Sequence, residues 1–127
     1  MTRFLAVCFG GALGSGARYL VALWAATTFG PAFPFGTLIV NVVGSFLLAF
    51  LMQMSTTTEW MSPAVRLMLT TGVMGGFTTY SAFNYETSRY IRQGAWAIGF
   101  LNVAATLLGC LAAGFAGLAL ARVLFGR

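Results

Sequence analysis

Residues 72–83, GVMGGFTTYSAF, form the stretch that decides how this chain folds. The stretch begins with glycines, continues with hydroxyl and aromatic side chains, and lies inside a largely apolar segment of about residues 64–86. Non-helical backbone in mid-membrane survives only where it is buried in protein or lines water, and there it offers carbonyls to cations and amides to anions. We therefore predict a spanning helix that is broken near mid-membrane, with the function at the break.

The composition indicates that the chain lies in a lipid bilayer. Of its 127 residues, 59% are hydrophobic and only 7% are charged, whereas a soluble globular domain has about 25% charged residues. The chain contains no His and no Asp, and its two acidic residues, Glu59 and Glu86, are far apart in the sequence. A Ser/His/Asp triad, a His-ligated metal and an aspartate dyad are excluded, so we expect no enzyme. The arginines form no basic tract, which argues against a nucleic-acid partner.

Four stretches are long and apolar enough to cross a membrane, which takes about 20 residues. They cover about residues 4–29, 37–54, 64–86 and 95–125, and each connection between them contains proline or glycine. We predict an all-α membrane protein in which four transmembrane helices form a single domain, residues 1–127. The lipid bilayer is then its surroundings, and we expect a multi-pass protein of the plasma (inner) membrane.

The arginines are divided almost equally between the two ends of these spans. With four spans, the N-terminus, the second connection and the C-terminus share one side, which carries Arg3, Arg66, Arg122 and Arg127. The opposite side carries Arg18, Arg89 and Arg92. Because Lys/Arg asymmetry orients membrane proteins, this balance predicts insertion in both orientations and an antiparallel, dual-topology dimer. The alternative is that one arginine dominates and fixes a single topology.

Two of the apolar segments carry polar residues at the spacing i, i+4 and i+8, which places them on one face of a helix. In the second segment they are Thr37, Asn41 and Ser45, and in the fourth they are Asn102, Thr106 and Cys110. Such residues either cross-link helices by hydrogen bonds or line an aqueous path. Two stripes in one small protein favour a path, and helix contact stays open as the alternative.

Two aromatic residues follow the glycine-rich stretch. Tyr80 and Phe83 stand at i and i+3, so their rings share a helix face. A ring edge carries partial positive charge, and two such edges offer an anion a weakly attractive site. The alternative is that both are ordinary core or lipid-facing aromatics. Arg18 lies well inside the first span, where its side chain either reaches the membrane interface or attracts anions into a vestibule.

Two motifs make the chain resemble a known family. GTLxVN covers residues 36–41, and TGxxGGxTTxSxFxxE covers residues 71–86. With the apolar first segment and its late arginine, these motifs resemble the CrcB/Fluc fluoride channels over essentially the whole chain. The resemblance implies a dual-topology homodimer that exports fluoride passively through two antiparallel pores. It also implies a structural sodium ion at the centre of the dimer.

The resemblance further implies a role for individual residues. The backbone carbonyls of Gly75 and Thr78 would hold the sodium ion. The fluoride pathway would comprise Asn41, Thr79, Tyr80, Ser81, Phe83, Asn102, Thr106 and Cys110. Arg18 and Glu86 would belong to vestibules at the pore mouths. The chain departs from the family pattern at Tyr80, where Phe is usual, at Cys110, which is often Ser, and at Ala82 and Asn84, where hydroxyl residues are common.

Two other classes of protein are compatible with four short spans. One is a small proton- or cation-coupled exporter of the dual-topology type, which relies on a membrane-embedded carboxylate. Residues 4–54 contain no carboxylate, and Glu86 at the end of the third span is a weak substitute. The other is a non-transporting membrane scaffold, in which the polar stripes only hold helices together.

Overall fold

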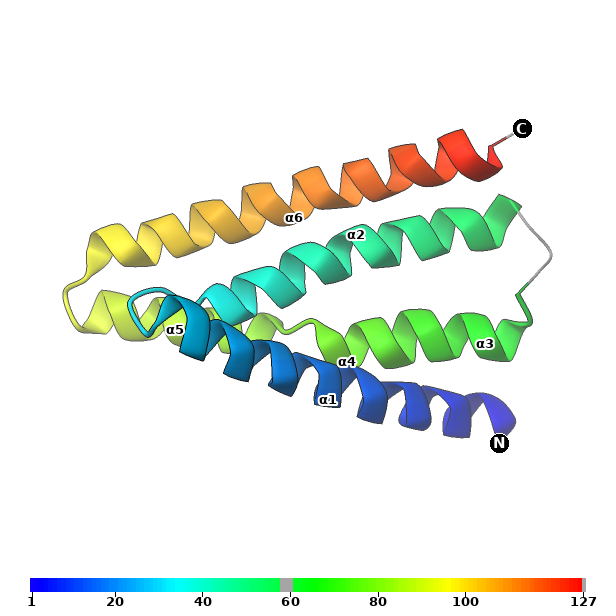
Figure 1. Ribbon diagram of the computed structural model, residues 1–127, viewed down its shortest axis with the longest axis horizontal. Helices are drawn as coiled ribbons and strands as arrows, with labels where there is room; N and C mark the ends of the chain where they lie inside the picture. Colours follow the sequence, from blue (N-terminus) through cyan, green and yellow to red (C-terminus); the bar gives the residue numbers. More distant parts are fainter. Residues whose placement is uncertain (58–60, 127) are drawn as a thin grey trace.

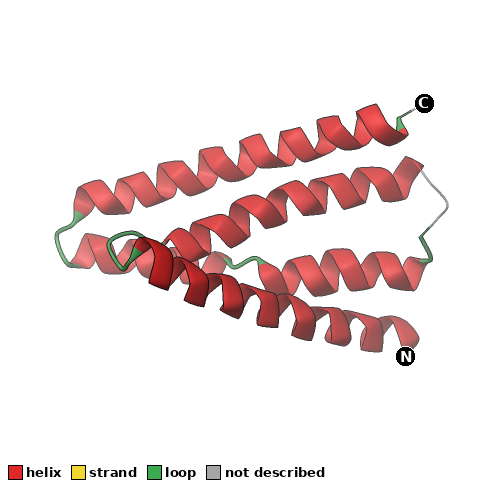
Figure 2. Cartoon of the chain, in the orientation of Figure 1, coloured by secondary structure: helices red, strands yellow, loops and turns green. Residues whose placement is uncertain are grey.

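The computed structural model describes residues 1–57 and 61–126 of the chain, and all regular structure in these ranges is helical (Figure 2). Three long helices are α1 (Thr2–Phe29), α2 (Phe35–Thr57) and α6 (Trp96–Phe125). Between α2 and α6 the chain forms four short helical pieces in succession: α3 (Pro63–Leu67), the π-helix η1 (Met68–Met74), α4 (Gly75–Phe77) and α5 (Tyr80–Arg92).

The helices make four passes, as predicted, and the protein is a multi-pass membrane protein. α1, α2 and α6 contain 28, 23 and 30 residues and are each long and apolar enough to cross a bilayer. The remaining pass is the broken one, residues 63–92, which reaches Arg92 instead of ending near residue 86. The end of α5 is polar, so apolar character alone underestimates the length of this pass.

The N-terminus, the start of α3 and the ends of α2 and α6 lie at the same end of the molecule (Figure 1). The α1–α2 and α5–α6 connections lie at the opposite end, as the predicted order of four spans requires. Arg127, one of the arginines divided between the two sides, lies outside the described residues. Gly30 and Gly94 end α1 and the broken pass with φ values of 75° and 77°, a backbone region that glycine adopts at little cost.

The break in the third pass lies at Thr78 and Thr79, which have extended backbones with ψ values of 158° and 114°. The prediction of a broken helix is confirmed, but the three preceding glycines are helical. Two of them permit close packing instead. A Cβ on Gly72 would lie 2.8 Å from the carbonyl oxygen of Val7, and one on Gly76 would collide with the carbonyl of Gly11.

Glycines of α1 complete this contact from the other side. A Cβ on Gly10 or on Gly14 would collide with the carbonyls of Met68 or Val73 in η1. Small residues on both helices let the two backbones approach closely, which is a common way of packing helices in membranes. We call the contact of Gly10 and Gly14 with Gly72 and Gly76 the glycine seam.

The two halves of the third pass pack against different helices. η1 and α4 pack along α1, whereas α5 packs on α6, and α6 runs beside α2 (Figure 1). The break is therefore the place where the third pass exchanges one neighbour for another. Gly44 of α2 lets the break come close, because a Cβ there would collide with the methyl group of Thr78.

Gly14→Ala should destabilise the bundle, because the added Cβ meets the carbonyl of Val73 across the glycine seam. Overpacking of this kind costs about 1–3 kcal/mol. We expect a lower melting temperature in detergent micelles. Gly16→Ala is the matched control, since nothing lies within 4 Å of a Cβ at that position. Equal destabilisation by the two substitutions would contradict the seam.

Candidate functional site

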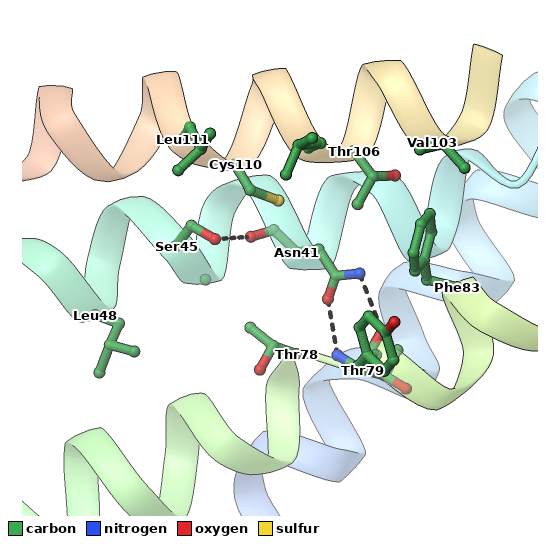
Figure 3. A pocket seen from close by; sticks show the side chains of 13 residues that line it. Asn41, Ser45, Leu48, Thr78, Thr79, Phe83, Val103, Thr106, Cys110 and Leu111 are labelled. Atoms are coloured by element: carbon green, nitrogen blue, oxygen red, sulfur yellow. Dashed lines mark hydrogen bonds between the residues drawn. The ribbon is translucent and has the colours of Figure 1, made fainter. Parts of the chain in front are cut away.

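A cavity of about 570 Å³ lies beside the break, between α2, α5 and α6 (Figure 3). Its walls combine neutral polar groups with aromatic and aliphatic side chains, and no charged side chain is among the described residues that line it. The lining residues are Asn41, Gly44, Ser45, Leu48, Thr78, Thr79, Tyr80, Phe83, Val103, Thr106, Leu107, Cys110 and Leu111.

The side chain of Asn41 holds the break in place through two reciprocal hydrogen bonds. Its Nδ2 donates to the carbonyl oxygen of Thr79 at 3.0 Å, and the Thr79 amide donates to Oδ1 of Asn41 at 2.7 Å (Figure 3). Both residues are buried. Ser45, one turn further along α2, donates its hydroxyl to the Asn41 carbonyl at 2.7 Å. Asn41 thus cross-links two helices, which was one of the two alternatives considered from the sequence, and it also lines the cavity.

The side chain of Thr79 begins α5. Its Oγ1 accepts a hydrogen bond from the Ala82 amide at 3.2 Å, as an N-cap residue does. The Ser81 hydroxyl lies 3.2 Å from the same Oγ1. Ser81 itself is exposed and does not line the cavity, whereas Thr79 does. Gly75, just before the break, is also exposed, and nothing lies within 4 Å of the position of a Cβ there.

The rings of Tyr80 and Phe83 lie on the same side of α5 and contact each other. Their centroids are 5.7 Å apart and their planes are inclined by 54°, so neither ring covers the face of the other. Both residues line the cavity. Tyr80 is 78% exposed within this single chain, although it lines the cavity.

The polar stripe of α6 divides between two environments. Thr106 and Cys110 line the cavity, and the buried Oγ1 of Thr106 has no hydrogen-bond partner among the described residues. Asn102 does not reach the cavity. It is 1% exposed, and its Nδ2 donates to the Thr87 hydroxyl on α5 at 2.9 Å. Thr87 was missed from the sequence, although it lies one turn after Phe83.

A second, smaller cavity of about 240 Å³ lies at the end of the bundle where the α1–α2 and α5–α6 connections are found. Glu86, Arg89 and Thr37 line it, and Thr37 donates its hydroxyl to Oε1 of Glu86 at 2.7 Å. Thr37 therefore does not share a cavity with Asn41, one turn away on α2. Arg18, the other predicted vestibule residue, lines neither cavity.

The chain is similar to known proteins over almost its whole length. Residues 5–118 match the family described as "CrcB-like protein, Camphor Resistance (CrcB)". The fluoride-specific ion channel FluC of Anaeromyxobacter dehalogenans is 59% identical over 99% of this chain and 100% of its own length. The proteins of the same name from Sorangium cellulosum and Agrobacterium fabrum are 52% and 45% identical, over 96% and 98% of this chain and 96% and 100% of their own lengths.

Thr87→Val should lower the free energy of unfolding by about 1–3 kcal/mol, because it leaves the buried Asn102 amide without its acceptor. Adding Asn102→Leu should recover most of that loss, since apolar replacement of both partners is close to neutral. Chemical unfolding in mixed micelles measures both. Ser88→Ala, at the exposed neighbour of Thr87, is the control. Strictly additive losses in the double variant would show that the bond contributes nothing.

Proposed function

The chain belongs to the CrcB family, and on that premise we propose that it is a passive, fluoride-selective ion channel of the inner membrane. It exports fluoride from the cytoplasm. Relatives that match it from end to end are named fluoride-specific ion channels. The observation in this chain that carries the proposal is the cavity beside the break. The described residues that line it supply neutral donors and ring edges and no fixed charge.

The lining chemistry suits an ion that holds its water tightly. A channel must replace that hydration with protein groups, yet bind weakly enough for the ion to leave. The amide of Asn41, the hydroxyl of Thr106 and the ring edges of Tyr80 and Phe83 are donors of this kind. An arginine in the same place would bind the anion too strongly. Export then needs no coupling, because the negative interior of the cell drives an anion outward.

A sodium ion at the break fits the backbone of this chain. In an α-helix the carbonyl of residue i accepts from the amide of residue i+4. In a continuous helix the Gly75 carbonyl would accept from the Thr79 amide and the Thr78 carbonyl from the Ala82 amide. In this chain both amides donate to side chains instead. The carbonyls of Gly75 and Thr78 are thereby released, as they are at the unwound helices that bind sodium in transporters. The ion would supply a fixed positive charge between the two subunits of the dimer.

A second copy of the chain, antiparallel to the first, would complete the site. Tyr80 is 78% exposed although it lines the cavity, and the apolar lining residues Leu48, Leu107 and Leu111 are exposed as well. Gly75 also faces away from its own chain. A partner covering this surface would enclose the cavity and add its own carbonyls to the cation. Two copies in opposite orientations would then form two antiparallel pores.

Liposomes that contain the purified protein should release fluoride rapidly once a potassium ionophore removes the opposing voltage. Chloride should pass at least a hundredfold more slowly. The proposed selectivity depends on a few neutral donors and ring edges that replace the hydration of a small anion. Ion-selective electrodes measure both fluxes. Comparable chloride and fluoride fluxes would refute the proposed selectivity, and fluoride flux that requires a proton gradient would favour a coupled exporter instead.

Phe83→Ile is the matched variant for this assay, because it removes a ring that lines the cavity and keeps an apolar side chain of moderate size. Fluoride flux should fall about tenfold or more while the protein elutes from gel filtration as before. Unchanged flux would contradict a role for the ring edge of Phe83 in conduction.

Dual topology is tested with Ala32→Cys, at an exposed position in the α1–α2 connection, in a chain that also carries Cys8→Ala and Cys110→Ala. If copies insert both ways, a membrane-impermeant maleimide should label about half of them in intact cells and all of them after permeabilisation. The near balance of arginines is the physical reason. Labelling of all copies, or of none, in intact cells would contradict the antiparallel dimer.

A further inference from the structure

We propose that Asn41 is a positioning residue for the cation at the break, in addition to lining the cavity. Its amide binds both backbone groups of Thr79 and so keeps the Gly75 carbonyl free for the ion. This inference rests on the sodium site proposed above. Under this inference the backbone of the third pass binds the ion, and a side chain on α2 keeps that backbone available.

The helical hydrogen-bond ladder explains why the break needs such a residue. If α4 continued as a regular helix, the Thr79 amide would donate to the Gly75 carbonyl. In the structure this amide donates to Oδ1 of Asn41 at 2.7 Å instead. Thr79 is 8% exposed, and a buried amide without a partner costs about as much as a lost hydrogen bond. Without Asn41, the Gly75 carbonyl is the nearest alternative acceptor along the ladder, and the two groups would satisfy each other.

Asparagine suits this task because its carboxamide carries an acceptor and a donor side by side. Oδ1 takes the Thr79 amide while Nδ2 donates to the Thr79 carbonyl, so both polar groups of one extended residue are satisfied in a buried position. A leucine offers neither group. The second hydrogen of Nδ2 stays available to the cavity, so positioning the break and contacting an anion do not compete.

The Thr78 carbonyl is kept free in the same way, by a different side chain. Its ladder partner would be the Ala82 amide, which donates to Oγ1 of Thr79 at 3.2 Å. Thr79 therefore contributes twice: its backbone is held by Asn41, and its hydroxyl removes the amide that Thr78 would otherwise bind. The two carbonyls implicated in cation binding are the two whose ladder partners are diverted to side chains.

The test measures how sodium stabilises the purified full-length protein. The melting temperature is recorded while NaCl replaces N-methyl-D-glucamine chloride at constant ionic strength, and the sodium concentration at half-maximal stabilisation is compared between variants. A ligand that binds only the native state raises its stability in proportion to its affinity, so this midpoint follows sodium binding and not flux. Asn41→Leu should raise the midpoint about tenfold or more.

Asn102→Leu is the matched control, because it removes another buried asparagine that joins two helices without touching the break. It should lower the melting temperature and leave the sodium midpoint unchanged. An equal shift of the midpoint in both variants would overturn the inference, because loose packing would then suffice to weaken the site. An unchanged midpoint in Asn41→Leu, with normal sodium stabilisation of the unsubstituted protein, would also overturn it while leaving the sodium site intact.

A second pair of variants tests the same principle at the Thr78 carbonyl and does not depend on whether Asn41→Leu folds. Thr79→Val removes the hydroxyl that accepts the Ala82 amide and should make this amide available to the Thr78 carbonyl, whereas Thr79→Ser keeps the hydroxyl. The sodium midpoint should rise in Thr79→Val and stay close to normal in Thr79→Ser. Equal midpoints would show that diverting a ladder amide to a side chain does not control sodium binding, which would overturn the premise of the inference. Absence of any sodium stabilisation in the unsubstituted protein would refute the sodium site itself, and this inference with it.

Discussion

A peptide group in the middle of a bilayer has no water to bond with, and the extended backbone at Thr78 and Thr79 depends on meeting that constraint. Asn41 meets it by binding both backbone groups of Thr79. The close approach of α2 that this requires is possible because residue 44 is glycine. Burial of Thr79 at the break and the diversion of its amide away from the Gly75 carbonyl therefore both follow from one contact between α2 and the third pass.

The number of passes and the existence of the break could be predicted from the sequence. Hydropathy predicts spans because a helix that crosses a bilayer must be predominantly apolar. A polar, glycine-rich stretch within a span indicates irregular backbone. The break lies within the predicted stretch, residues 72–83, but the extended residues themselves could not be predicted, since glycine serves both unusual backbone angles and close helix contact. Here Gly72 and Gly76 serve contact with α1, and the extended residues are two threonines.

The polar stripes were predicted as faces of helices, but not their environments. Thr106 reaches the cavity while Asn102, one turn earlier, binds Thr87. Likewise Thr37 binds Glu86 in the second cavity and Asn41 binds the break. The division depends on where α5 lies after the break, which is a property of the folded bundle and not of helix periodicity. The spacing of a stripe therefore identifies a polar face without saying what that face contacts.

The exchange of neighbours at the break gives the two halves of the third pass different supports. The glycine seam joins the first half to α1, whereas α5 packs mainly on α6. Thr78 and Thr79, whose backbones are extended, connect these two halves. A substitution at Gly10 or Gly14 would push on the half of the third pass that ends at this connection, and would thus alter the geometry of the cavity although neither glycine lines it.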